Sequence, residues 1–338
     1  MKKLVKGLLL TAFWVSTAFT LPAFAGTKVV NCDEGDSLQA ALDSGRGSAA
    51  PIEIELYGTC EEMITIPRDQ VTIFGIDGAT IFGQVRHFGV SNVTLRDLTI
   101  TGPGNGILAR GGRMRLIGVN LIENYDHGVR AHDGAAVNLS RSQVGNNGGP
   151  FGIVAYGSNV NLNFTDVYGH PEYGVAVTDN SSANIYGGSI TGNGLGVFGN
   201  NSVVSIRDTW IGDNIGDGVS LGGARVTLFD VTISGNGSIG LFVNFTGSAM
   251  AFGGAIENNG GSGIYADLHA VVGLDGTRVV GNGNHGIELV RDAGAIITGT
   301  SYVPANLSGL AAWCGDEESS LQVDEPAEVG DRDDCTDF

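Results

Sequence analysis

A glycine followed by an aliphatic residue recurs ten times between Gly106 and Leu310, and this repeat constrains the fold more than any other feature of the sequence. Successive glycines lie 22 to 24 residues apart. Self-similarity at such a period predicts one small structural unit that is stacked many times. The pairs are Gly106-Ile107, Gly128-Val129, Gly152-Ile153, Gly174-Val175, Gly196-Val197, Gly218-Val219, Gly240-Leu241, Gly263-Ile264, Gly286-Ile287 and Gly309-Leu310.

A second column, of asparagine, precedes the glycines from Gly128 to Gly286. Its members are Asn124, Asn147, Asn193, Asn214, Asn236, Asn259 and Asn282, and His170 breaks it once. Asparagine tolerates left-handed backbone, and stacked asparagine side chains can hydrogen-bond to one another, so we expect tight corners and a ladder here. After each glycine, apolar and polar residues alternate with the period of a strand that has one buried face. Each unit is therefore predicted to hold two or three short strands, with the aliphatic residue after the glycine in a buried stack.

A unit of this length is too short for a strand and a crossover helix, yet its equivalent strands must lie side by side. The chain is therefore predicted to coil once per repeat. Over roughly residues 50 to 313 the arrangement resembles the right-handed parallel β-helix superfamily, which includes pectate lyases and polygalacturonases. The resemblance implies an all-β solenoid of ten or more coils. It does not imply one activity, because the superfamily also holds epimerases, phage tailspikes and adhesins.

The two ends differ from the repeat. Residues 1–25 have three lysines, an apolar stretch and Ala23-Phe24-Ala25, which predicts a secretory signal peptide and a secreted, periplasmic or cell-surface location. Residues 26–60 are predicted to form an N-terminal cap with a short helix that begins at Asp36 or Ser37 and stops at Gly45. We assign residues 61–313 to the β-helix and residues 314–338 to an acidic C-terminal tail.

Four cysteines in an exported chain favour disulfides over metal ligands. Cys32 and Cys60 bracket the segment before the regular coils, and Cys314 and Cys335 bracket the tail after them. We therefore predict one disulfide within each end.

The formal net charge of −18 argues against nucleic acid or a bare anionic membrane as partner. It also weighs against tight binding of polyanionic glycans unless cations bridge them. The tail holds ten carboxylates, which could take up Ca²⁺ although their spacing matches no EF-hand loop. The sequence identifies no other cofactor and does not predict an oligomeric state.

Candidate functional residues lie two and four positions after the glycines, where side chains should face outward. Those suited to binding sugars are Arg110, Arg130, Tyr156, Thr178, Phe198, Phe242 and Tyr265. At the preceding corners and beside this sheet, carboxylates and imidazoles could form a general acid/base set for glycan cleavage or epimerisation. These candidate catalytic residues are Asp126, His127, His132, Asp133 and Glu172, and we expect the corner residues to lie along one edge beside His132 and Asp133.

The motifs of the resembling enzymes are absent. Polygalacturonases carry NTD, DD, GHG and RIK on successive coils, and the only similar element here is Asn284-His285-Gly286. The DPHD or DPHE motif of mannuronan epimerases is missing, and Tyr125-Asp126-His127 echoes it only loosely. Two classes of function therefore stay open: a carbohydrate-active enzyme (lyase, epimerase or hydrolase), and a non-catalytic structural or adhesin-like rod. Either would contact polysaccharide or a cell-surface glycan on the outer strand face, at the coils that begin with Gly106, Gly128, Gly152 and Gly174.

Overall fold

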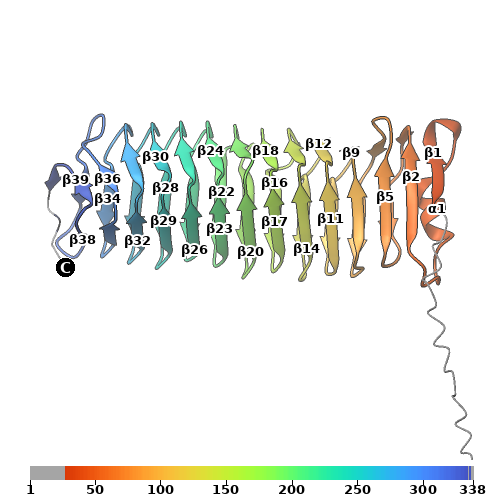
Figure 1. Ribbon diagram of the computed structural model, residues 1–338, viewed down its shortest axis with the longest axis horizontal. Helices are drawn as coiled ribbons and strands as arrows, with labels where there is room; N and C mark the ends of the chain where they lie inside the picture. The colour runs from red at the N-terminus through yellow and green to blue at the C-terminus, as the bar shows by residue number, and fades with distance from the viewer. Residues whose placement is uncertain (1–26, 334, 336–338) are drawn as a thin grey trace, which may run out of the picture.

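The computed structural model describes residues 27–333 and residue 335, so the predicted signal peptide lies outside the described residues. Within them, strands stack into three parallel sheets along a rod of about 13 coils (Figure 1). Each coil contributes one strand to each sheet, which confirms the predicted parallel β-helix. Of the residues that the structure describes, none belongs to a helix with the length and hydropathy that a bilayer crossing requires.

We name the sheets A, B and C in the order in which the chain visits them. Sheet A consists of β1 (Lys28–Asn31), β2 (Ile52–Tyr57), β5 (Val71–Gly75), β8 (Val93–Arg96), β11 (Arg113–Ile117), β14 (Ala136–Ser140), β17 (Asn159–Asn163), β20 (Ser182–Tyr186), β23 (Val203–Arg207), β26 (Arg225–Phe229), β29 (Ser248–Phe252), β32 (Val271–Asp275), β35 (Gly294–Thr298) and β38 (Ser320–Val323).

Sheet B consists of β3 (Thr59–Cys60), β6 (Thr80–Phe82), β9 (Thr99–Gly102), β12 (Asn120–Asn124), β15 (Gln143–Gly145), β18 (Asp166–Tyr168), β21 (Ser189–Thr191), β24 (Trp210–Gly212), β27 (Thr232–Ser234), β30 (Ala255–Glu257), β33 (Arg278–Val280), β36 (Tyr302–Val303) and β39 (Glu328–Val329). Sheet C consists of β4 (Ile64–Ile66), β7 (Val85–Phe88), β10 (Ile107–Arg110), β13 (Val129–His132), β16 (Phe151–Tyr156), β19 (Tyr173–Thr178), β22 (Leu195–Asn200), β25 (Val219–Gly222), β28 (Leu241–Asn244), β31 (Ile264–Asp267), β34 (Ile287–Val290), β37 (Ala312–Cys314) and β40 (Arg332–Asp333).

The aliphatic residue after each repeated glycine pairs with its equivalent on the next coil, from Ile107 to Ile287, and each of these nine side chains is fully buried. Glycine precedes them because the corner is too tight for a side chain: a Cβ at Gly128 would lie 2.3 Å from Val144 Cγ1. The predicted interior stack is confirmed up to this point.

The tenth predicted pair, Gly309-Leu310, is wrong. Ile287 pairs with Ala312 and Glu288 with Trp313, so the last coil is longer and Ala311 takes the place of the glycine. Leu310 is accordingly only half-buried. Trp313 lies in register with residues two positions after the glycine, not four, because backbone pairing and not the nearest Gly-aliphatic pair sets the register.

The asparagine ladder is confirmed. In the regular part of the column each side-chain amide donates to the side-chain oxygen of the next member, as Asn214 Nδ2 does to Asn236 Oδ1 at 2.9 Å, and Asn306 extends the column. The expected left-handed backbone is absent from the ladder members. It falls on the residue before some of them, such as Asn146 and Asn258, because the ladder asparagine itself must point into the buried corner.

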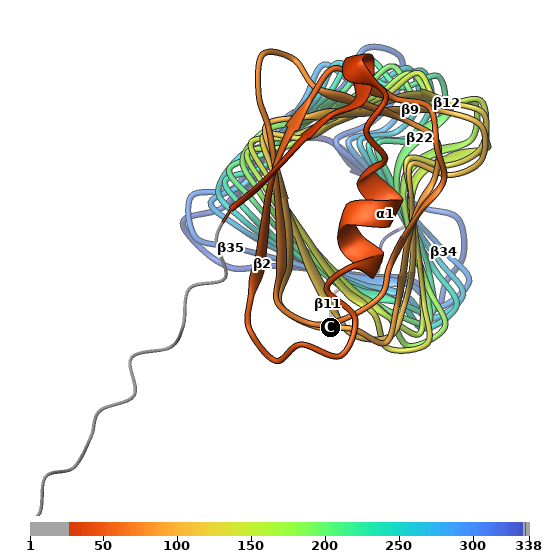
Figure 2. The same cartoon turned by 90° about the vertical axis from the view of Figure 1, so that its right-hand side faces the viewer.

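The two ends of the rod contain the predicted capping helix and the two predicted disulfides. Helix α1 (Leu38–Asp43) follows the short helix η1 (Cys32–Glu34), and Ser37 caps α1 by accepting from Ala40 N at 3.1 Å. The helix lies across the open end of the rod with Leu38 and Leu42 buried beneath it (Figure 2). The disulfides Cys32–Cys60 and Cys314–Cys335 are confirmed and include all four cysteines.

We expected the coils to stop at Trp313, but they continue into the tail. Strands β38, β39 and β40, all within the acidic tail, pair with β35, β36 and β37. The strands β1, β2 and β3 likewise lie inside the segment predicted as the N-terminal cap. Alternating apolar residues such as Leu321 let these irregular ends close over the last buried side chains.

Candidate functional site

The predicted binding residues lie on the outward face of sheet C, in two rows that run along the rod. Row 1 holds the residue two positions after each glycine, and row 2 the residue four positions after it. Cross-strand pairing places Leu108, Arg130, Val154, Ala176 and Phe198 next to one another in row 1. It places Arg110, His132, Tyr156 and Thr178 next to one another in row 2.

A cationic and aromatic cluster occupies rows 1 and 2 on β10, β13 and β16. The ring of His132 stacks on that of Tyr156 with centroids 5.1 Å apart, and the guanidinium of Arg130 lies 6.0 Å from the Tyr156 centroid. Arg130 Nε is buried and has no hydrogen-bond partner among the described residues. Burial lowers the pKa of His132, and the charges of Arg130 and Arg110 lower it further. The imidazole is therefore neutral at neutral pH and offers an unprotonated ring nitrogen.

A second aromatic stack borders the other edge of sheet C. His127, Phe151, Tyr173 and Phe198 stack in that order, with centroid distances of 5.0, 5.3 and 4.8 Å. Between this stack and row 2, Val154 and Ala176 face outward, yet they are only 0% and 2% exposed because the flanking side chains cover them.

Val154 and Ala176 of row 1 thus lie covered between the half-buried rings of Tyr156 on one side and of Phe151 and Tyr173 on the other. These partly exposed rings suit the apolar face of a sugar ring.

The candidate catalytic residues do not form one set. Asp126, His127 and Glu172 precede the sheet C strands, whereas His132 and Asp133 end β13 or follow it. Five residues of nearly extended chain separate His127 from His132, which is about 16 Å at a strand's rise. The expectation that the corner residues lie beside His132 and Asp133 is therefore wrong, because the two groups lie at opposite ends of the sheet C strands.

His127 is held as part of the corner. It is 6% exposed, its Nδ1 accepts from Phe151 N at 3.4 Å, and its Nε2 lies 3.4 Å from Asp126 Oδ1. Burial lowers the pKa of His127 against the opposing effect of Asp126. Glu172 is exposed at the same corner two coils further on. Of the five candidates, His132 has the accessible, neutral imidazole beside the binding rows.

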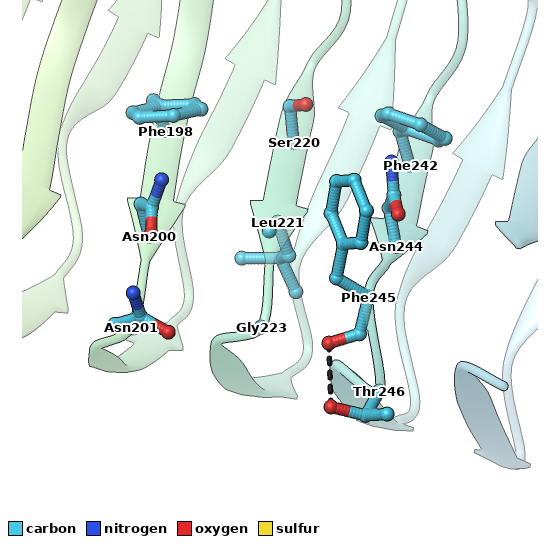
Figure 3. Close-up of a pocket in the computed structure, with 11 residues that line it drawn as sticks. Phe198, Asn200, Asn201, Ser220, Leu221, Gly223, Phe242, Asn244, Phe245 and Thr246 are labelled. Atoms are coloured by element: carbon cyan, nitrogen blue, oxygen red, sulfur yellow. Dashed lines mark hydrogen bonds between the residues drawn. The ribbon is translucent and has the colours of Figure 1, made fainter. Parts of the chain in front are cut away.

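A hollow of about 400 Å³ lies further along the same face, between Phe198 and Phe242 (Figure 3). Ser220 separates the two rings in row 1, and Asn200 and Asn244 line the hollow from row 2. Asn244 Oδ1 is buried and has no hydrogen-bond partner among the residues that the structure describes. The sequence predicted the two phenylalanines but missed Asn200, Ser220 and Asn244.

The rim of this hollow is formed by Phe245 and Thr246, which the sequence analysis also missed. Both have left-handed backbone, with φ of 52° and 58°, and Phe245 is 60% exposed. Aromatic and β-branched residues rarely adopt this conformation. A signal was present in the sequence, because the equivalent corner positions of three earlier coils are Asp179, Asn201 and Gly223.

Beyond Phe242 the face becomes acidic. Tyr265 packs against Phe242 with centroids 5.4 Å apart, and burial, followed by Asp267 and Glu288, raises the pKa of Tyr265. Asp267 is buried and paired with Arg291, whose Nε lies 2.6 Å from Asp267 Oδ1. This part of the sheet C face therefore suits the hydroxyl groups of a ligand better than its carboxylates.

A group of carboxylates lies at the C-terminal end of the rod. Oxygen atoms of Asp292, Asp316 and Glu318 lie within 4.8 Å of one another. Asp316 also accepts from Ser319 N at 2.8 Å. Carboxylate oxygens are the ligands that Ca²⁺ takes, and two of the three residues come from the tail that could take up Ca²⁺ by its sequence.

Comparison with known proteins identifies the class. Residues 83–250 match the family model described as right handed beta helix region, and the chain has the right-handed parallel β-helix fold. Its fold is similar to the A-modules of two mannuronan C-5 epimerases of Azotobacter vinelandii. For AlgE6 the TM-score is 0.66 at 17% identity, over 91% of this chain and 99% of that one. For AlgE4 the TM-score is 0.64 at 17% identity, over 90% of this chain and 100% of that one. No curated protein sequence matches the chain.

Proposed function

We propose that this protein is exported and binds an acidic polysaccharide lengthwise along the outward face of sheet C. The observation that carries the proposal is the alignment of Arg110, Arg130, His132 and Tyr156 on successive coils, with the stacked rings of Phe151 and Tyr173 on the same sheet. Arginine pairs with carboxylates in bidentate fashion, and tyrosine offers a face on which a sugar ring stacks. The two disulfides fit an oxidising compartment.

The acidic composition of the whole chain weighs against binding of an acidic glycan, but the charge around the proposed site is positive. Residues 86–141 contain seven arginines and four carboxylates, a net charge of +3, in a chain whose net charge is −18. Arg110 and Arg130 lie inside this segment on sheet C. An acidic polymer is therefore attracted to this part of the rod and repelled by the rest.

Alginate is the first polymer to test, because the two epimerase modules of similar fold are named for mannuronan. The assay is calorimetric binding to alginate and polygalacturonate, with dextran as the neutral polymer. The variant Arg130→Gln/His132→Asn should raise the Kd about tenfold or more, since charge-assisted hydrogen bonds are lost. The control is Arg278→Gln, an exposed arginine on sheet B.

Wild-type affinity together with wild-type stoichiometry in the double variant would refute the proposed site. A wild-type protein that binds neither acidic polymer would refute the function.

A catalytic role is the second candidate, and the lowered pKa of His132 favours it. A neutral imidazole stacked on a tyrosine could remove the proton from the carbon beside a uronate carboxylate. Return of a proton to the opposite face gives epimerisation, in which no other bond changes. The segment Arg130-Ala131-His132-Asp133 shares its last two residues with the DPHD motif but has arginine in place of the first aspartate.

The test is incubation of alginate with the protein in deuterated water, followed by NMR of the polymer. Deuterium at C-5 that is lost in His132→Asn supports catalysis. Binding without exchange assigns the protein to the non-catalytic class.

A further inference from the structure

A second polar surface lies around the corner from the proposed site, on the outward face of sheet A. It spans four adjacent strands, β11, β14, β17 and β20, and comprises two rows set by cross-strand pairing. One row reads Arg113, Ala136, Asn159 and Ser182, and the other reads Arg115, Asn138, Asn161 and Asn184. We call these eight residues the amide face.

The asparagines of the amide face are held in fixed orientation. Asn161 Nδ2 donates to Asn138 Oδ1 at 2.6 Å, and Asn184 Nδ2 donates to Asn161 Oδ1 at 2.8 Å. A side-chain amide has two N–H donors and an oxygen with two lone pairs, so each asparagine retains donor or acceptor capacity toward solvent. Asparagine is depleted in strands, and here the hydrogen bonds between neighbouring asparagines link the strands of the row.

The amide face is hollowed where its smallest side chain lies. A cavity of about 560 Å³ is lined by Arg113, Arg115, Ala136 and the asparagines of β14, β17 and β20. A second cavity of about 430 Å³ shares Arg113, Ala136 and Asn159 with it. Neither cavity is lined by an acidic residue of the described part of the chain, although the sequence contains 36 of them.

The arginines give this hollow a charge preference. Arg113 and Arg115 are both exposed at its N-terminal end. Only Gly111 and Gly112 separate Arg113 from Arg110, which belongs to the sheet C face. The two surfaces therefore lie on different sheets that meet at one corner of the same coil.

We infer that the amide face is a second, separate binding site for an acidic glycan. Arg113 and Arg115 bind uronate carboxylates, Asn138 and Asn161 exchange hydrogen bonds with ring hydroxyls, and the space above Ala136 accepts the sugar ring. With a site on each of two sheets, one rod holds two polysaccharide chains and cross-links them. The inference is independent of the proposed function, because it concerns another face and other residues.

The experiment is calorimetric titration with oligomannuronate and with oligogalacturonate, using a maltooligosaccharide as the neutral probe. The wild-type protein should bind two acidic oligomers per chain. Arg130→Gln/His132→Asn, which disables the sheet C face, should leave one. In that background, Arg113→Gln/Arg115→Gln should raise the Kd of the remaining site about tenfold or more.

Two further variants test the position of the site. Ala136→Phe fills the hollow without changing the charge and should block the remaining site. Arg207→Gln/Arg225→Gln is the matched control, because both arginines are exposed on sheet A and Arg225 lies in the row of Arg113. It should leave binding unchanged.

The inference is overturned if the remaining site survives both Arg113→Gln/Arg115→Gln and Ala136→Phe, if the control weakens binding equally, or if the wild type binds a single oligomer that Arg130→Gln/His132→Asn releases. Loss of all binding in Arg113→Gln/Arg115→Gln, with no effect of Arg130→Gln/His132→Asn, would instead refute the sheet C proposal and keep this one.

Discussion

Replacing His170 by asparagine should make the protein less sensitive to acid. His170 is 1% exposed in the asparagine ladder, with Nδ1 2.9 Å from Asn193 Oδ1 and Nε2 3.1 Å from Asn147 Nδ2. An amide oxygen only accepts and an amide nitrogen only donates, so Nδ1 carries the hydrogen and Nε2 is a lone pair. Asn147 cannot turn over without loss, because its oxygen accepts from Asn124 Nδ2 at 2.8 Å. The ladder therefore forms two hydrogen bonds with the neutral imidazole, whereas the protonated imidazole would place an N–H against the Asn147 amide nitrogen.

The magnitude follows from the pKa. Burial lowers the pKa of His170 from 6.5 to about 4, against the smaller opposing effect of the hydrogen bond to Asn193. In the unfolded chain His170 becomes protonated below pH 6.5, whereas in the native state it stays neutral down to about pH 4. The free energy of unfolding is thus unaffected by His170 above about pH 7 and falls as pH drops through this window. The loss is about 2 kcal/mol at pH 5 and about 3 kcal/mol below pH 4.

The assay is urea unfolding of the wild type and His170→Asn at about pH 7.5 and about pH 5. The wild type should lose about 2 kcal/mol more than the variant between the two pH values. Asparagine fits the site because it occupies the same ladder position on the neighbouring coils. His269→Asn, at an exposed histidine, is the control and should follow the wild type. Equal pH dependence in the wild type and His170→Asn would refute the reasoning.

Two other predictions concern the core and the C-terminal cap. Ile153→Ala removes a fully buried side chain from the interior stack and should lower the free energy of unfolding by ~2–5 kcal/mol, whereas Val203→Ala, at a residue 55% exposed, should change it little. Similar losses in both variants would contradict the assigned stack. Cys314→Ser/Cys335→Ser opens a disulfide that joins residues 21 apart and should cost about 3 kcal/mol, seen as earlier loss of hydrogen-exchange protection in the last coils than in the middle of the rod. Uniform loss along the rod would count against a local role.

Much of the scaffold followed from periodicity. A glycine where a corner has no room for Cβ, an aliphatic residue that must be buried and an asparagine that bonds to its own copy are each local requirements, and each recurs at the repeat interval. The interior stack from Ile107 to Ile287 and the ladder were predictable for this reason. Both disulfides were predictable for another reason, because each end of the chain holds one pair of cysteines. The same reasoning failed at Leu310, where a longer coil shifts the register and no local pattern marks the shift.

The functional surfaces were only partly predictable. The sequence by itself determined that Arg130 and Tyr156 face outward on neighbouring coils, since the period places equivalent residues side by side. The tertiary structure alone decided that His127 and His132 lie at opposite ends of a strand, and that Arg113, Ala136 and Asn159 enclose a hollow. These residues belong to different coils and share no contiguous motif. Their contacts depend on side-chain size and on register across three strands, which a one-dimensional period does not specify.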